Sequence, residues 1–432
     1  MHVLLASGSN AAGQLANGTI LDSHVFTPCL FSHSSDGGED LANIYSVRHV
    51  AAGARHALLL LERRNSGKIF IELWGCGDGS RGQLGHHYTE SLPGSSTSTS
   101  TFRLIQLPSR ILHDGYTHRL IASSWETSYV VLSCSNRNDV LVSMGADDFG
   151  NLGIPRKEKR DLGSVHTVDF NEILPPGTVQ VVVESLAAGL YHIVVHLNAT
   201  LADGSVRGLT AGWGSSRHGQ LGKISTPIDN GRPHVFSLED MHDPVVSLGL
   251  GMQHSVLLHA SGRISGLGSG KKNQLQGIHD QRDVRALGCT WNGTYVVVES
   301  EGEFRMMATG SYSKGQLGRP IPEHRGTSED IALAPVQFPF TSRTHRFVRM
   351  ACGSEHVLAL FEITSPNPTH KTEVWGWGWN EHGNLGTGTT DDLMLPQRIW
   401  PTSTWMESTA QETAVGIWAG CGTSWIAIQR PD

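Results

Sequence analysis

Four histidines of this chain occupy one recurring position, directly after a short glycine turn. His56, His192, His254 and His356 each end a Gly-x-x-His motif, as in the run AAGARH at 51–56. Imidazole is a common zinc ligand, so four such side chains could suggest a metal centre. However, a residue that recurs with its surrounding motif falls once in each repeat, and repeated identity usually reflects repeated packing. We therefore expect each histidine to hydrogen-bond a neighbouring loop of its own repeat unit, and we predict no metal site.

Other chemical motifs are incomplete. The run GLGSGK at 266–271 resembles a phosphate-binding loop but has three residues where that loop has four, and Lys272 replaces the magnesium-binding Ser or Thr. The run GCGDG at 75–79 is not followed by a βαβ unit, as a dinucleotide fingerprint would be. His86 and His87 are adjacent, which directs their rings apart and makes a poor chelate. We therefore predict no cofactor and no enzymatic activity.

A glycine cassette recurs seven times and explains why these motifs stand where they do. Its fullest form is Gly-x-x-x-x-Gly-Gln-Leu-Gly, as at 310–318, and successive cassette leucines lie 42 to 69 residues apart. The seven cassette leucines are Leu15, Leu84, Leu152, Leu221, Leu275, Leu317 and Leu385. A cassette that returns along the whole chain indicates one repeated structural unit.

Short β-prone runs flank both motifs. The segment 255–266, SVLLHASGRISG, contains two such runs around Ser261-Gly262, which is a hairpin signal. Four short antiparallel strands per unit make one sheet, so seven units predict an all-β seven-bladed propeller as one domain over residues 1–432. The chain starts with a strand-like segment, His2–Ala6, and ends with another, Trp425–Gln429. We expect these two to pair and close the ring.

This topology places the functional loops. The Gly-x-x-His loop precedes the first hairpin strand and the cassette follows the second, so both must lie on one face of the ring. Trp125, Trp291 and Trp379 lie in these loops, and tryptophan commonly anchors protein interfaces. Trp74, Trp213 and Trp375 precede cassette glycines and are expected to pack between blades.

Composition restricts the class of protein. A formal net charge of −7 argues against a general nucleic-acid or membrane surface, and no segment resembles a signal peptide or a membrane span. The six cysteines are scattered without a Cys-x-x-Cys motif, which is typical of a reduced protein of the cytoplasm or nucleus. The Ser/Thr-rich segment 92–101 is expected to be a mobile loop.

The paired signature resembles the repeat of the regulator of chromosome condensation family over the entire chain, and that family has a seven-bladed propeller fold. Several departures from the repeat are similar to those of its small fungal member, the alpha-tubulin suppressor, also called a killer-toxin-insensitivity protein. They include the runs SWETS at 124–128, CTWNG at 289–293 and WGWGWNEHGN at 375–384.

The resemblance implies a non-catalytic role. The fungal member forms a heterodimer with a small zinc-carrying electron-transfer protein of the diphthamide pathway. Together they support diphthamide synthesis on elongation factor 2 and, through the Elongator complex, wobble-uridine modification of tRNA. We expect the partner-binding surface to comprise Trp125, Glu126, Trp291, Asn292, Glu355, Trp379, Glu381 and His382.

Two other functions remain open. The founder of the family is a guanine-nucleotide exchange factor for the small GTPase Ran, and it uses an acidic propeller face. Acidic residues before the loop histidine are sparse in this chain, namely Glu126 and Glu355. A propeller lyase or hydrolase would instead place acid–base residues in the central channel.

Overall fold

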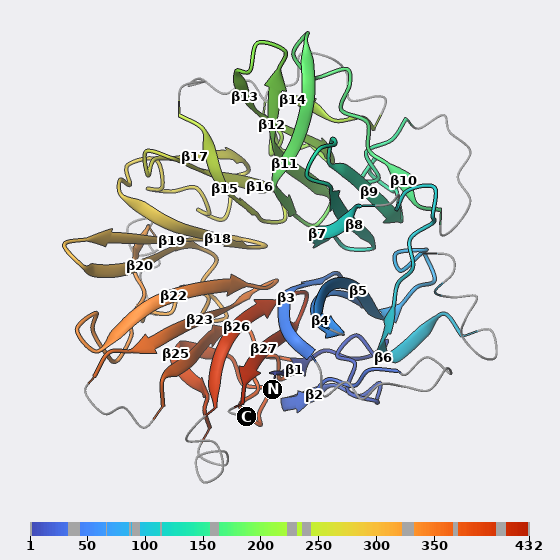
Figure 1. Ribbon diagram of the computed structural model, residues 1–432. Coiled ribbons are helices and arrows are strands. Elements are labelled where there is room, and N and C mark those ends of the chain that lie inside the picture. The colour runs from blue at the N-terminus through green and yellow to red at the C-terminus, as the bar shows by residue number, and fades with distance from the viewer. Residues whose placement is uncertain are drawn as a thin grey trace.

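The computed structural model forms a seven-bladed β-propeller (Figure 1). It describes residues 2–32, 44–65, 67–85, 88, 96–112, 115–155, 164–222, 231–235, 243–321, 332–365, 370–402 and 412–430. The sheets are antiparallel and follow one another around a central channel, which the innermost strand of each blade lines. Within the described ranges, no helix has the length and apolar character of a membrane span.

Each blade is a sheet whose strands run from the innermost, at the channel, to the outermost. Blade 1 contains β3 (Ile44–Ala52), β4 (His56–Asn65), β5 (Lys68–Asp78) and β6 (Ser98–Leu104), and blade 2 contains β7 (Thr117–Ser123), β8 (Thr127–Ser133), β9 (Val140–Gly145) and β10 (His166–Thr167). Blade 3 contains β11 (Thr178–Ala188), β12 (His192–Leu201), β13 (Val206–Gly214) and β14 (His234–Val235), and blade 4 contains β15 (Val245–Leu250), β16 (His254–His259) and β17 (Ile264–Gly268). Blade 5 contains β18 (Val284–Thr290), β19 (Gly293–Ser300), β20 (Glu303–Gly310) and β21 (Ala334–Pro335), and blade 6 contains β22 (His345–Cys352), β23 (His356–Ile363), β24 (Thr372–Gly378) and β25 (Leu393–Trp400). Blade 7 contains β26 (Thr413–Ala419), β27 (Thr423–Gln429), β1 (His2–Gly8) and β2 (Ser23–Pro28).

The two chain ends close the ring, as predicted. β1 pairs with β27 in an antiparallel register from His2↔Gln429 to Gly8↔Thr423. The amino-terminal segment supplies more than the predicted strand, because β2 pairs with β1 as the outermost strand of blade 7. Closure thus joins two strands from each end of the chain and leaves no unpaired edge on β27.

Blade 4 departs from the expected four strands. Its cassette ends at Leu275, and β18 of the next blade begins at Val284, so the fully described connection contains no outer strand. The shortest interval between cassette leucines, from Leu275 to Leu317, reflects this missing strand. In blade 1 the polar segment 92–101 was expected to be a mobile loop, but Ser98–Leu104 is strand β6, and 92–95 lie outside the described residues.

Seven hydrophobic clusters lie between the blades, one for each neighbouring pair. The closing strand β1 contributes to two of them: Leu4 and Ala6 pack with blade 1, whereas Leu5 packs with blade 6. Each blade therefore contributes apolar side chains on both faces of its sheet. Of the predicted packing tryptophans, Trp74 and Trp213 belong to these clusters, and Trp375 is partly buried against a third cluster.

The glycine cassettes join the two loops of each blade. At Gly77, φ is +87° and a Cβ would lie 2.3 Å from the Arg55 carbonyl, so only glycine permits this approach. The next residue, Asp78, then donates its N–H to that carbonyl at 2.8 Å. The equivalent bond occurs in all seven blades, with donors Ser9, Asp78, Ala146, Ser215, Ser269, Ser311 and Trp379. These bonds place both loops on one face, which we call the loop face. The hairpins between second and third strands form the opposite tip face.

Candidate binding surface

The four loop histidines link neighbouring blades. Their Nε2 atoms lie 2.9–3.1 Å from hydroxyl oxygens of the following blade. The pairs are His56–Ser128, His192–Ser255, His254–Thr294 and His356–Ser424. The prediction of a partner within the same unit was therefore wrong, because the ring brings the next blade's second strand against each imidazole.

These histidines are buried and neutral, and two of them, His192 and His254, are the donors of their inter-blade bonds. Ser255 and Thr294 donate their hydroxyls to the carbonyls of Gln220 and Gln274, so the imidazole nitrogen beside each must donate its proton. Burial lowers the pKa of His192 to about 3 and the pKa of His56, His254 and His356 to about 4. No group of three or more potential metal-binding side chains is found in the described part of the chain, and His86 and His87 lie outside it.

The loops between first and second strands, which we call inner loops, form a hydrogen-bonded rim around the channel. They comprise residues 53–55, 124–126, 189–191, 251–253, 291–292, 353–355 and 420–422. Main-chain bonds of 2.7–3.2 Å join five of the seven neighbouring pairs, for example Trp125 N–H to Leu190 and Trp291 N–H to Ser354. The rim therefore holds the two loop tryptophans in fixed positions.

Trp125 and Trp291 meet at this rim although they belong to blades 2 and 5. Their ring centroids are 6.0 Å apart with an interplanar angle of 49°, and both side chains are half-buried. Each indole therefore packs against the loop that carries the other tryptophan, while part of each ring stays exposed to solvent and free for contact with a partner. Beside them, Glu126 lies 3.7 Å from Arg81, which also pairs with Asp148 at 3.2 Å.

Glu355 connects blades 5 and 6. Its carboxylate accepts hydrogen bonds from the side chains of Asn292 at 2.7 Å and Gln316 at 3.1 Å. Burial raises the pKa of Glu355, while the two amide donors and the charge of Lys272 oppose that rise. The carboxylate is thus fixed in place, with less freedom to turn toward solvent than an exposed glutamate has.

Trp379 and His382 lie in the loop between β24 and β25 of blade 6 and extend the surface toward blade 7. The indole N–H of Trp379 donates to Glu381 at 3.1 Å, and its ring meets His382 edge-on at a centroid distance of 5.3 Å. His382 Nδ1 lies 2.7 Å from a carboxylate oxygen of Asp22. Asp22 belongs to the amino-terminal segment, so this pair also bridges the closure of the ring.

The eight residues predicted for partner binding form one continuous arc. Trp125 touches Trp291, Asn292 bonds Glu355, and the Glu355 carbonyl accepts the Trp379 N–H at 3.0 Å. We define the loop-face arc as Trp125, Glu126, Trp291, Asn292, Glu355, Trp379, Glu381 and His382. These contacts establish the placement of the residues on one face.

Sequence reasoning missed a second aromatic group on the same face. Phe149 and Tyr191 lie with ring centroids 4.4 Å apart, and the Arg217 guanidinium lies 5.7 Å from the Phe149 ring. Burial raises the pKa of Tyr191, and the nearby charges of Glu126 and Asp148 raise it further. All three residues stand at ordinary cassette or inner-loop positions, and their aromatic or cationic character was the only available signal.

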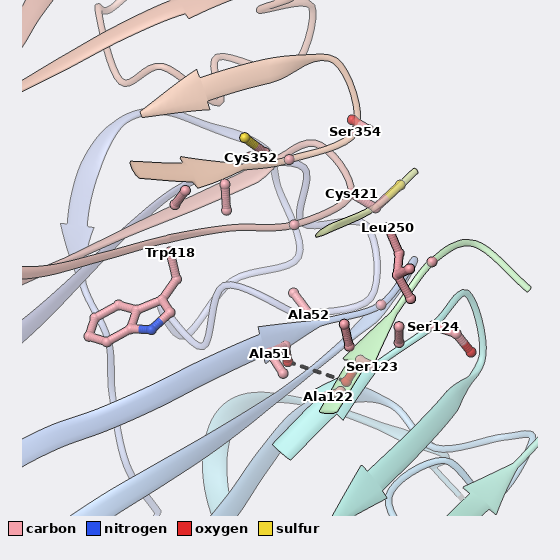
Figure 2. A pocket seen from close by; sticks show the side chains of 18 of the residues that line it. Ala51, Ala52, Ala122, Ser123, Ser124, Leu250, Cys352, Ser354, Trp418 and Cys421 are labelled. Atoms are coloured by element: carbon pink, nitrogen blue, oxygen red, sulfur yellow. Dashed lines mark hydrogen bonds between the residues drawn. The ribbon is translucent and has the colours of Figure 1, made fainter. Parts of the chain in front are cut away.

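A cavity of about 320 Å³ lies in the channel and is lined at one end by residues of the inner-loop rim. All seven blades line it, and Figure 2 shows Ala51, Ala52, Ala122, Ser123, Cys352 and Trp418 among the lining residues. Its lining residues include Arg349 and His49 but no aspartate or glutamate. The inward-pointing carboxylates that a glycosidase-like reaction uses are therefore absent from this lining.

Comparison with known proteins identifies the repeat. The Regulator of chromosome condensation (RCC1) repeat matches residues 308–360 and 372–424. Each match begins within the third strand of one blade and ends within the second strand of the next blade. The chain is an RCC1-like propeller. The sequence repeat of this RCC1-like propeller is thus offset from its structural blade.

Two relatives align with nearly the whole chain. The mouse protein named "Secretion-regulating guanine nucleotide exchange factor" is 26% identical, covering 99% of this chain and 84% of its own length. A Schizosaccharomyces pombe "RCC1 repeat-containing protein" is 24% identical and covers 99% of both chains. Among solved structures, Prp20p from Saccharomyces cerevisiae aligns with a TM-score of 0.71 at 17% identity, covering 100% of this chain and 92% of its own. Human WBSCR16 aligns with a TM-score of 0.68 at 19% identity, covering 99% of both chains. These two structures support the fold alone.

Proposed function

We propose that this RCC1-like propeller is a non-catalytic binding protein that holds a protein partner on its loop face. The observation that carries the proposal is the loop-face arc. Its residues come from three blades, and Trp125, Glu126, Trp291 and Asn292 lie in inner loops that lack the repeated histidine. Tryptophans in a prearranged, half-buried setting are the usual anchors of protein interfaces.

The partner we propose is a small zinc-carrying electron-transfer protein of the diphthamide pathway. The pair would support diphthamide synthesis on elongation factor 2 and, indirectly through Elongator, tRNA wobble-uridine modification, in the cytoplasm and nucleus. Support comes from the shared departures from the repeat, which supply Trp125, Trp291 and Trp379 of the arc. The fungal relative that aligns over nearly its whole length is compatible with this assignment.

A second candidate is exchange of guanine nucleotide on a small GTPase. It is favoured by the name of the mouse relative, which aligns with nearly the whole chain. The loop face carries both signs of charge, for example Arg81 with Asp148 and Lys314 with Asp392 at 3.1 Å.

The two functions are separated with purified proteins. We expect the zinc-carrying protein to bind the chain with a 1:1 stoichiometry in isothermal titration calorimetry. We expect Ran and other small GTPases loaded with fluorescent nucleotide to release it at the same rate with and without the chain. A tenfold or greater acceleration of release, together with no binding of the zinc protein, would establish the exchange function instead.

A further inference from the structure

The central cavity contains an arginine that forms no ion pair with any carboxylate of the described residues. Arg349, on the innermost strand β22 of blade 6, is the one arginine or lysine among the residues that line it. In the described ranges no carboxylate forms an ion pair with Arg349. Burial lowers its pKa, yet a guanidinium stays protonated at neutral pH. The cavity therefore holds an uncompensated positive charge, which is costly away from bulk water.

The guanidinium is held against an aromatic ring. Its carbon lies 5.4 Å from the centroid of Trp418, on β26 of blade 7. This indole needs a glycine beside it, because a Cβ at Gly416 would lie 2.4 Å from its Cη2 atom. Stacking on an aromatic face orients a guanidinium but uses none of its five N–H donors. None of these donors is bonded within the part of the chain that the structure describes, so they remain for another molecule in the cavity.

The other side of Trp418 is fixed by blade 1. Its indole N–H donates to His49 Nδ1 at 3.1 Å, and the two ring planes meet at 83°. Burial, with the nearby charge of Arg349, lowers the pKa of His49 to about 4. His49 is consequently neutral, and since Nδ1 accepts, its proton lies on Nε2. Three blades thus build an Arg349–Trp418–His49 unit; Figure 2 shows Trp418 between the ribbons of blades 6 and 1.

We propose that this cavity binds a small anion that carries a carboxylate or phosphate group recognised by Arg349. The planar guanidinium fork suits both groups in a bidentate arrangement. A volume of about 320 Å³ falls at the lower end of small-molecule sites and holds a compact metabolite better than a peptide segment. Ser123, Ser124 and Ser354 also line the cavity, as do three cysteines. This site lies within the channel and is separate from the proposed partner-binding arc, apart from Trp125 and Trp291 at its rim.

The test uses the full-length chain with inorganic phosphate and succinate as probes, at constant ionic strength maintained with sodium chloride. Isothermal titration calorimetry and thermal melts measure binding. We expect at least one probe to bind saturably and to raise the melting temperature. Arg349→Met, which keeps the length and removes the charge, should weaken that binding at least tenfold. Arg207→Met removes an exposed arginine at the tip face and should leave it unchanged.

Arg349→Lys provides a second variant if Arg349→Met does not fold. It keeps the charge but loses the planar fork, so binding should weaken severalfold without disappearing. The proposal would be overturned if neither probe bound the wild type saturably at concentrations up to about 10 mM. A dissociation constant above that concentration corresponds to less than about 3 kcal/mol of binding free energy, which is too weak for specific recognition. Equal binding by wild type and either Arg349 variant would overturn it as well, because the anion would then bind elsewhere.

Discussion

Removal of the Ser424 hydroxyl should reveal how strongly the loop histidines couple neighbouring blades. Ser424 lies 3.0 Å from His356 Nε2, and neither residue is exposed to solvent. Ser424→Ala leaves the buried Nε2 atom of His356 without its hydrogen-bond partner, which costs about 1–3 kcal/mol. His356→Ala removes the imidazole and opens a cavity, so its cost should approach about 3–5 kcal/mol, the range for loss of a large buried side chain.

The double variant separates the hydrogen bond from these other effects. Once the imidazole is gone, removing the hydroxyl should cost little, so the two losses should fall short of additivity by about 1–2 kcal/mol. Urea unfolding followed by tryptophan fluorescence measures each free energy of unfolding. The control pair is His356→Ala with Ser128→Ala, because Ser128 bonds His56 at another blade boundary. That pair should be additive within about 0.5 kcal/mol. Additivity in the His356–Ser424 pair would refute the inter-blade role.

Three further outcomes follow from the fold. Between pH 6.5 and about 4 the four loop histidines are protonated in the unfolded chain but neutral in the folded one. The free energy of unfolding should therefore be highest above pH 6.5 and fall below it by up to about 1.4 kcal/mol per pH unit per histidine. A flat profile of urea midpoints over this range would contradict the assignment of neutral histidines. Deleting residues 1–8 removes β1 with Leu4 and Leu5, and should abolish cooperative unfolding in thermal melts, whereas a truncated chain that melts like the full chain would show that closure is dispensable. Gly77→Ala should destabilise the chain more than Gly67→Ala in chemical denaturation, since both have positive φ but only the Gly77 Cβ would clash, and equal losses would mean that the approach to the Arg55 carbonyl is unimportant.

The repeat pattern predicts the fold because each cassette specifies local geometry. Glycine with positive φ, the buried leucine and the inner loop recur together, so seven sheets and their common loop face follow from one unit. The three-stranded blade 4 also has a sequence signal, the short interval between Leu275 and Leu317. What this interval lacks is space for an outer strand.

The inter-blade histidine bonds were also encoded in the sequence, although the prediction placed them within one blade. A blade with the loop histidine is always followed by one with Ser or Thr directly after the corresponding position: Ser128, Ser255, Thr294 and Ser424. After a blade without that histidine, the equivalent residue is apolar: Ala57, Ile193 and Val357. Comparing successive repeats at these two positions predicts the pairing without a structure.

Contacts across the ring have no such signal. Trp125 and Trp291 meet from blades 2 and 5, and the Arg349–Trp418–His49 unit combines blades 6, 7 and 1. Their spacing in the sequence follows no local period, because the approach depends on the diameter of the closed ring and the height of each residue along its strand. Only the assembled propeller brings these side chains together.

Affinity for the small zinc-carrying protein, compared between variants of the two faces, tests the proposed binding surface most directly. Trp379→Ala alters the loop-face arc, and Phe70→Ala removes an exposed aromatic ring of β5 near the hairpin of the tip face. The proposed surface predicts that Trp379→Ala raises the dissociation constant about thirtyfold, equivalent to roughly 2 kcal/mol, with little change in melting temperature. Phe70→Ala should bind like the wild type. Undiminished affinity in a folded Trp379→Ala variant, with affinity lost in Phe70→Ala, would move the binding surface to the opposite face.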